Sequence, residues 1–160
     1  TCERYGMVVM PWSPLAGGWL TGKYRKGGAT PDSQRARLRP DRFDFSLPEN
    51  QRKLDLIEEF AKVADDAGLS MTHMAMAFVV SHPAVSAAII GPRTMEQLTD
   101  VLAGADVELG DDILDRLDEI VPPGTTINAA DAGWSPPSIT NSFHRRRPAG
   151  RRAAGQTAGP

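Results

Sequence analysis

Two short segments combine hydroxyl, glycine and basic residues in patterns suited to binding phosphate. The first is residues 12–18 (WSPLAGG), and the second is residues 91–98 (GPRTMEQL). In the first, the hydroxyl of Ser13 and the backbone amides that glycine leaves accessible can hydrogen-bond a phosphate oxygen. In the second, Arg93 stands at the start of a predicted helix, where free N–H groups and the positive dipole end attract anions. A cation there opposes the dipole, so a bound anion explains Arg93 well.

Each of these segments follows an apolar run that predicts a strand. The runs at residues 6–12 (GMVVMPW) and 85–90 (VSAAII) are short and apolar on both faces, which is typical of buried parallel strands. Residues 23–47 are polar and basic without sustained periodicity. We therefore expect a long loop there, of the kind that forms lids and binding segments.

The spacing of apolar residues predicts four helices. Their expected ranges are about 46–67, 70–82, 94–103 and 111–121. Ser46 and Glu49 match a capping box for the first helix, and Ser70 can cap the second. The third helix is expected to face inward through Met95, Leu98 and Leu102.

The order strand, helix, helix, strand, helix, helix predicts an α/β fold with a parallel sheet and right-handed crossovers. Two strands alone would leave unpaired edges and bury too little surface, so we expect further strands upstream. The chain also begins with Thr1 rather than Met and enters an apolar run by Met7. We interpret it as a fragment of a longer protein.

Three runs resemble the last two strands and helices of the aldo-keto reductase family. They are PWSPLAGGWLTGKY, AIIGPRTMEQL and DVELGDDILDRLDEI, and the resemblance covers residues 1–125. It implies the C-terminal part of a (β/α)8 TIM barrel, with strands seven and eight and their helices but an incomplete barrel. Phosphate sites in such barrels commonly lie in the loops after these two strands. Beyond residue 125, we expect an ordered C-terminal loop at 126–140 and a disordered tail rich in Arg, Gly, Ala and Pro at 141–160.

The resemblance also implies a cofactor site for NADP, with NAD possible. Trp12 would stack on the nicotinamide, while Ser13, Leu15 and Gly17 would bind the pyrophosphate. Lys23 and Arg35 would approach the phosphates from the loop over the dinucleotide. The remaining expected contacts are Gly91 and Arg93 around the 2′-phosphate, and Gln97 and Asp100 toward adenine. Val101 stands where many relatives carry an asparagine that bonds adenine, which leaves the preference between NADP and NAD open.

Simpler roles for several of these residues stay open. Trp12 can be a strand-end core residue, and Ser13 can merely open a turn. Thr94 and Gln97 match a capping box, so Gln97 can bond the helix backbone instead of adenine, or do both. The histidines lack metal-ligand spacing and are expected to be packing or surface residues.

The resemblance implies an NADP-dependent oxidoreductase that reduces aldehydes or ketones to alcohols. The family's catalytic Asp, Tyr, Lys and His lie on earlier strands, so no catalytic residue is expected in this chain, which should be inactive alone. One alternative is a dinucleotide-binding regulatory subunit resembling potassium-channel β subunits. Another is an inactive truncated product.

Composition excludes several other classes. The net charge is -2, which favours neither nucleic acid nor a membrane surface as a partner. Cys2 is the only cysteine, so an internal disulfide is impossible and a reducing, cytoplasmic location fits. No apolar run approaches the roughly 18 residues of a membrane span. A small carbonyl substrate is the expected partner, and the sequence indicates no oligomeric state.

Overall fold

The computed structural model of the chain describes residues 2–133. The chain divides into two units, Thr1–Asn128 and Ala129–Pro160. In the second unit the described part is a 3-10 helix at Ala129–Asp131, closed by a bond from Ala132 N to Ala129 O. Our predictions for residues 134–160, which include the last part (134–140) of the expected C-terminal loop and the whole tail, lie outside the described residues.

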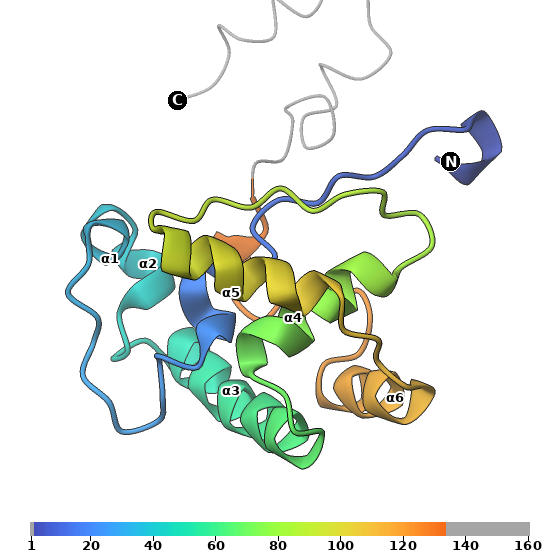
Figure 1. The fold of residues 1–160 in the computed structure, drawn as a ribbon. Helices are drawn as coiled ribbons and strands as arrows, with labels where there is room; N and C mark the ends of the chain where they lie inside the picture. Colours follow the sequence, from blue (N-terminus) through green and yellow to red (C-terminus); the bar gives the residue numbers. More distant parts are fainter. Residues whose placement is uncertain (1, 134–160) are drawn as a thin grey trace, which may run out of the picture. The chain divides into compact units, whose positions relative to one another are not determined.

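The described part of the first unit is mainly helical (Figure 1). All four predicted helices are present. The α-helices are α1 Gln34–Leu38, α2 Pro40–Phe43, α3 Pro48–Asp66, α4 Met71–Ser81, α5 Met95–Ala105 and α6 Asp111–Ile120. Two 3-10 helices, Glu3–Tyr5 and Ala16–Thr21, precede them. The expectation that residues 23–47 form only a loop was wrong, because this segment contains α1 and α2.

Side-chain caps at Ser33, Ser70 and Thr94 begin three of the six α-helices. Ser70 caps α4, since its hydroxyl accepts a hydrogen bond from His73 N at 3.1 Å. The predicted capping box of α3 was wrong: Leu47 is the N-cap residue and Pro48 opens the helix. Ser46 instead donates through its backbone N and its hydroxyl to Asp44 Oδ1, each at 2.8 Å. Ser46 therefore bonds the carboxylate of Asp44 and does not cap α3.

The two predicted strands pair in parallel but do not form regular strands among the described residues. Isolated parallel bridges join Val9 to Val85 and Trp12 to Ile89. Ile89 N donates to the carbonyl of Pro11 at 2.8 Å, but Pro11 has no N–H to return a bond. The parallel direction is confirmed, while the regular ladder was wrong because two segments alone have no flanking partners.

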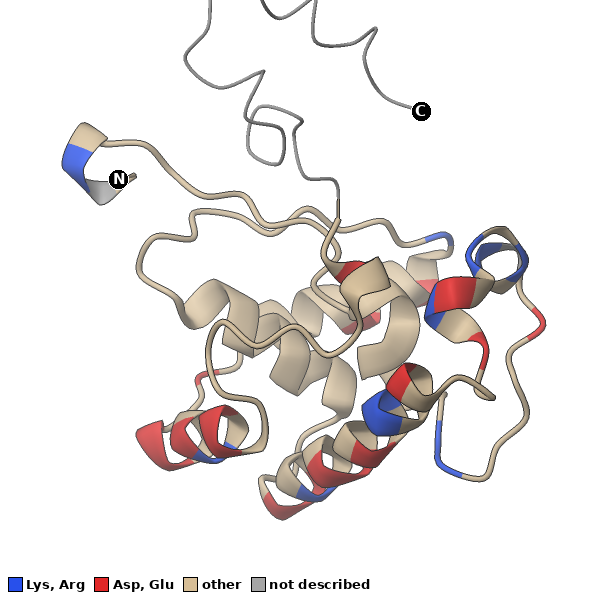
Figure 2. Cartoon of the chain, turned by 180° about the vertical axis from the view of Figure 1, so that it is seen from behind, with Lys and Arg blue, Asp and Glu red and all other residues tan. Residues whose placement is uncertain are grey.

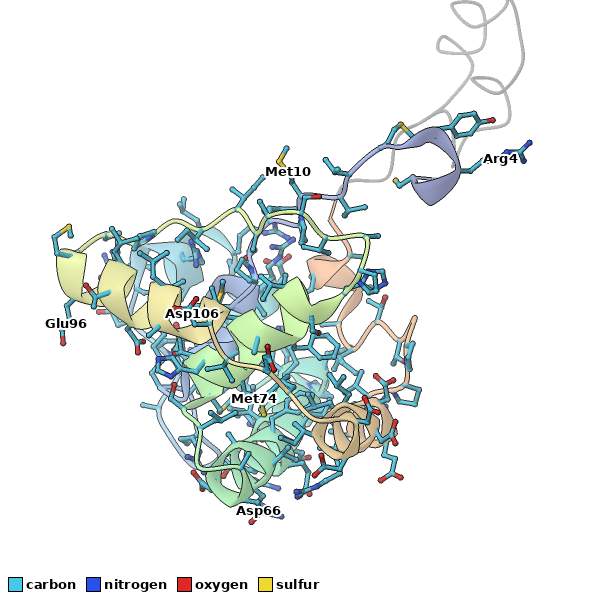
Figure 3. All side chains as sticks on the ribbon, turned by 45° about the vertical axis from the view of Figure 1, so that its right-hand side comes forward. Arg4, Met10, Asp66, Met74, Glu96 and Asp106 are labelled. Carbon is cyan, nitrogen blue, oxygen red and sulfur yellow. The ribbon has the colours of Figure 1, made fainter. Side chains whose placement is uncertain are left out.

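The predicted burial of these segments was also wrong. Met7, Val8 and Met10 are 50%, 61% and 59% exposed. Figure 3 shows Met10 projecting away from the ribbon, whereas Met74 of α4 lies inside, between helices. The core forms where helices surround a side chain. The apolar side chains of the paired segments are instead exposed to solvent.

The core lies around four aromatic rings and the inner faces of α3, α4 and α6. The rings are those of Trp19, Tyr24, Phe43 and Phe45. Its other buried members include Leu54, Ile57, Ala61, Val63, Ala64, Met71, Met74 and Leu117. Acidic residues gather on the outer surfaces of α3 and α6 (Figure 2). This division gives both helices the amphipathic pattern that made them predictable.

Helices α4 and α5 pack side by side (Figure 1), and the small residue at their contact is Gly104 of α5. The inward residues of α5 are Val101 and Gly104, whereas Met95 and Leu102 are 72% and 52% exposed. The predicted inward face of this helix was therefore wrong for Met95 and Leu102. The close approach at Gly104 rotates the helix so that its larger apolar side chains point outward.

Replacing Gly104 with alanine should destabilise the protein by about 1–3 kcal/mol, because the new methyl group overpacks the contact. A Cβ here would lie 2.9 Å from His73 Cα and 3.0 Å from Met76 Cβ. Urea unfolding followed by circular dichroism measures the change. The control is Ala103→Ser, an exposed position on the same helix, which should change stability by less than about 0.5 kcal/mol. Equal stability of Gly104→Ala and the unsubstituted protein would contradict the tight contact.

Candidate functional site

The loop after residues 6–12 has a strained backbone at Ser13. Its φ of 60° lies in the left-handed region, which non-glycine residues rarely adopt and which costs on the order of 1–3 kcal/mol. The Ser13 carbonyl accepts from Ala16 N at 2.8 Å, and the Ser13 hydroxyl accepts from Gly17 N at 3.2 Å. Gly17 and Gly18 follow with φ of 72° and 102°, which glycine adopts freely. The result is a tight, self-bonded loop, as expected where backbone must approach a ligand.

Three side chains from the following segment lie against this loop. Arg35 Nη1 donates to the carbonyl of Gly17 at 2.9 Å. A Cβ on Gly17 would lie 3.3 Å from Phe43 Cζ, so the α2 ring packs directly against the loop. Lys23 Nζ would lie 2.9 Å from a Cβ on Gly18. The structure thus brings Lys23 and Arg35 to Gly17 and Gly18, and their contact with the cofactor phosphates stays a prediction.

The aromatic residues beneath the loop were not predicted from the sequence. Trp19 is 3% exposed and packs against Tyr24, Phe43 and Phe45, with ring centroids 5.3 to 5.9 Å away. Three of these rings lie within the polar segment at 23–47. Their presence in an otherwise basic stretch was the one available signal that this segment contacts a core.

The second loop leads into α5 and has its own internal bonds. Thr94 caps the helix by accepting from Gln97 N at 3.2 Å, and Gln97 Oε1 accepts from Arg93 N at 2.9 Å. The cap at Thr94 is therefore confirmed, the Gln97 side chain bonds the residue before the cap, and contact of Gln97 with adenine stays a prediction. Arg93 is exposed, and its guanidinium forms no ion pair with any described residue.

Asp100 has a partner that the sequence did not reveal. Its Oδ1 lies 3.0 Å from His73 Nε2, which joins α5 to α4. The two residues stand on different helices, so only the tertiary packing brings them together. His73 is thus a partner of a candidate cofactor residue, beyond the packing or surface role expected for it.

The two loops leave the paired segments at the same edge. The bridge between Trp12 and Ile89 lies immediately before Ser13 and two residues before Gly91. Because the pairing is parallel, both chains leave the bridge on the same side. The Trp12 ring is 71% exposed, so its alternative role as a core residue was wrong in the described part of the chain.

The donor set at this edge suits the phosphates of a dinucleotide. It combines the Ser13 hydroxyl, the strained glycine-rich backbone and three cationic side chains, those of Lys23, Arg35 and Arg93. Guanidinium groups bind phosphate bidentately and ammonium groups bind it as point charges. Among the described residues, no group of three or more side chains could hold a metal ion. The hydroxyl, amide and cationic groups are of the kinds that bind anions.

Glu58 of α3 holds the start of the segment that carries Lys23 and Arg35. Its Oε1 accepts from Arg25 Nε and from Lys26 N, both at 2.9 Å. The hydrogen bond from Arg25, then the one from the Lys26 backbone, lowers the pKa of Glu58 from 4.5 to about 2. The carboxylate thus stays charged at neutral pH and keeps residues 25–26 against α3.

Comparison with known proteins places this geometry in a family. The model of the aldo/keto reductase family matches residues 1–122. The chain therefore belongs to the aldo/keto reductase family, whose members generally use nicotinamide dinucleotide cofactors. This match confirms the resemblance seen in the sequence.

Individual relatives agree with this assignment. The uncharacterized oxidoreductase YrpG from Bacillus subtilis is 38% identical over 120 residues, covering 74% of this chain and 34% of that protein. A putative voltage-gated potassium channel subunit beta from Schizosaccharomyces pombe is 31% identical over 123 residues, covering 74% and 35%. The structure of a glycerol dehydrogenase from Gluconobacter oxydans matches with a TM-score of 0.60 and 25% identity, covering 84% of this chain and 40% of that chain. The chain spans about a third of the length of these curated relatives, and the likeness supports an α/β fold.

Within the described residues, no helix is both long enough and apolar enough to span a membrane.

Replacing Glu58 with glutamine should loosen residues 23–32 at neutral pH, because the carboxylate that binds Arg25 and Lys26 is lost. A carboxyl with a lowered pKa stabilises the fold fully above about pH 4.5, and this contribution is lost as pH falls toward about 2. The stability difference between the two proteins, measured by urea unfolding across this range, should therefore shrink on acidification.

The control for this experiment is Glu59→Gln on the same helix. Glu59 pairs with Lys62 and contacts neither Arg25 nor Lys26. Limited proteolysis at neutral pH should cleave residues 23–32 faster in Glu58→Gln than in Glu59→Gln. Equal cleavage, or a stability difference that does not change with pH, would contradict the role given to Glu58.

Proposed function

We propose that this chain supplies the cofactor phosphate and adenosine site of an NADP-dependent oxidoreductase that reduces small aldehydes or ketones to alcohols. The observation that carries the proposal is the parallel bridge between Trp12 and Ile89, which brings the Ser13 loop and the Arg93 loop to one edge. Family membership supports an oxidoreductase, and three cations at the site support a phosphate-rich cofactor.

The chain would form strands seven and eight of a (β/α)8 barrel together with their helices. Two features support this placement. The paired segments expose the apolar side chains that neighbouring strands and helices would cover in a closed barrel. The relatives that it matches are about three times as long as the matched region. The catalytic Asp, Tyr, Lys and His would then come from earlier strands.

The tyrosines of this chain are poor candidates for the catalytic acid. Tyr5 is 67% exposed on the 3-10 helix before the first paired segment, while Tyr24 is 8% exposed within the aromatic cluster. Neither lies at the edge where Ser13 and Arg93 approach each other. The residues of this chain would therefore bind and orient the cofactor, which supplies the hydride when bound.

Each candidate residue has a role that its position supports. The exposed Trp12 ring would stack on the nicotinamide, and Ser13, Leu15 and Gly17 would bind the pyrophosphate. Lys23 and Arg35 would approach the phosphates from the side of the glycine loop. Gly91 and Arg93 would bind the 2′-phosphate, and Gln97 and Asp100 would border adenine while keeping their bonds to Arg93 N and His73. The single cysteine would suit the cytoplasm.

Replacing Arg93 with glutamine should weaken NADPH binding about 10- to 100-fold and change NADH binding much less, because a charge-assisted bond to the 2′-phosphate is lost. Titration of the natural full-length protein, followed by tryptophan fluorescence, measures both dissociation constants. The matched control is Arg37→Gln, which removes an exposed arginine paired with Asp32. If Arg93→Gln weakens NADPH no more than Arg37→Gln does, the assignment of the phosphate site fails.

A second candidate function is that of a dinucleotide-binding regulatory subunit. It is favoured by the relatives described as voltage-gated potassium channel beta subunits, which are 29–31% identical to this chain. Both functions share the cofactor site but differ in turnover. Oxidation of NADPH by the full-length protein in the presence of small aldehydes supports the reductase, and tight NADPH binding without turnover supports the regulatory subunit.

A further inference from the structure

Three side chains satisfy the carbonyl groups of the short helix α2 and the residue after it. Asn50 Nδ2 donates to the carbonyl of Asp41 at 3.2 Å and to that of Asp44 at 2.9 Å. Lys53 Nζ donates to the carbonyl of Arg42 at 2.9 Å. Asn50 is 0% exposed and Lys53 is 8% exposed. These bonds are shielded from water, so losing one leaves a buried carbonyl unsatisfied.

The third side chain comes from the far end of the first unit. Asn128 Nδ2 donates to the carbonyl of Asp41 at 3.0 Å and to Asn50 Oδ1 at 2.9 Å. Asn128 is 6% exposed, and it lies beyond the residues matched by the family model. A side-chain amide has two N–H donors: Asn50 Nδ2 donates to two backbone carbonyls, and Asn128 Nδ2 donates to one carbonyl and to Asn50 Oδ1. We call Asn50 and Asn128 the amide pair.

Helix α2 needs this support because it spans only four residues, Pro40–Phe43. A single turn has an unfavourable free energy of formation in water, since it fixes many dihedral angles for very few internal bonds. External bonds to its carbonyls therefore hold it in place together with the buried Phe43 ring. Those bonds come from α3 through Asn50 and Lys53, and from the end of the unit through Asn128.

The position of α2 affects the Ser13 loop, which contains Gly17. Phe43, its last residue, packs against Gly17, and α1 immediately before it carries Arg35, whose guanidinium binds the Gly17 carbonyl. Gly17 N in turn donates to the Ser13 hydroxyl. A continuous series of contacts thus runs from Asn128 through α2 to the group expected to bind the pyrophosphate.

We propose that Asn50 and Asn128 are positioning residues for cofactor binding. By fixing the carbonyl of Asp41, the amide pair places α2 so that Phe43 and Arg35 hold Gly17, and with it Ser13, ready for the phosphate. This inference rests on the proposed function, because it takes the Ser13 loop to be a phosphate site. It extends the determinants of that site to residue 128.

The test replaces Asn128 with alanine or aspartate in the natural full-length protein. Aspartate keeps the size of the side chain but cannot donate to the Asp41 carbonyl, so it separates the lost bonds from a cavity. Both variants should raise the NADPH dissociation constant about tenfold, as expected for loss of a buried hydrogen bond. The turnover rate at saturating NADPH should not change. Near-ultraviolet circular dichroism of the aromatic cluster verifies that each variant is folded, and Asn128→Ser replaces any variant that is not.

The control for general destabilisation is Ile113→Ala on α6. This residue packs against the core from α6, which contacts mainly α3. It should lower the melting temperature while leaving the NADPH dissociation constant unchanged. If it weakens binding as much as Asn128→Ala at equal loss of stability, the positioning role is overturned.

A parallel set of variants separates this inference from the proposed function. If Ser13→Ala and Arg93→Gln leave NADPH binding unchanged, the phosphate site itself is wrong. If these two weaken binding while Asn128→Ala and Asn128→Asp do not, the site stands and the role of the amide pair is overturned.

Discussion

The packing of the Trp19 ring is the interaction on which the rest of the described structure depends. Trp19 belongs to the glycine-rich loop, its neighbours Phe43 and Phe45 belong to the segment before α3, and Lys53 of α3 places its ammonium group 4.2 Å from the ring. The buried indole N–H finds no acceptor among the described residues, which costs about 1–3 kcal/mol. Aromatic pairing and the cation–π contact offset this cost. Hydrophobic packing at Trp19 therefore holds this segment against the core.

The second constraint is the direction of pairing between the two extended segments. A parallel pair sends both chains out at the same edge, whereas an antiparallel pair would send the Ser13 loop and the Arg93 loop to opposite ends. The pairing has few hydrogen bonds, since Pro11 lacks a donor, and both segments expose apolar side chains. Such a pair gains regularity from strands on either side, which is what the proposed barrel would supply.

The sequence predicted the features that depend on local pattern. The four long helices follow from apolar spacing, and the caps at Ser70 and Thr94 follow from residue type. Helices α1 and α2 escaped prediction because five and four residues are too few to show a period. The pairing of His73 with Asp100 escaped it because the residues stand on different helices. In the site, a glycine-rich loop could be read directly, while the side chains that hold it depend on tertiary contacts.

In the proposed site, recognition of the phosphate and recognition of the base depend on different residues. Gln97 already accepts from Arg93 N, and Asp100 already pairs with His73, so the start of α5 is organised by its own contacts. Preorganised groups lose less entropy on binding. Val101 is 6% exposed and packs inward, so it offers adenine nothing. The guanidinium of Arg93 has no ion-pair partner in the described part of the chain. In the proposed site, discrimination between the two dinucleotides therefore falls on Arg93 and the 2′-phosphate rather than on contacts to the base.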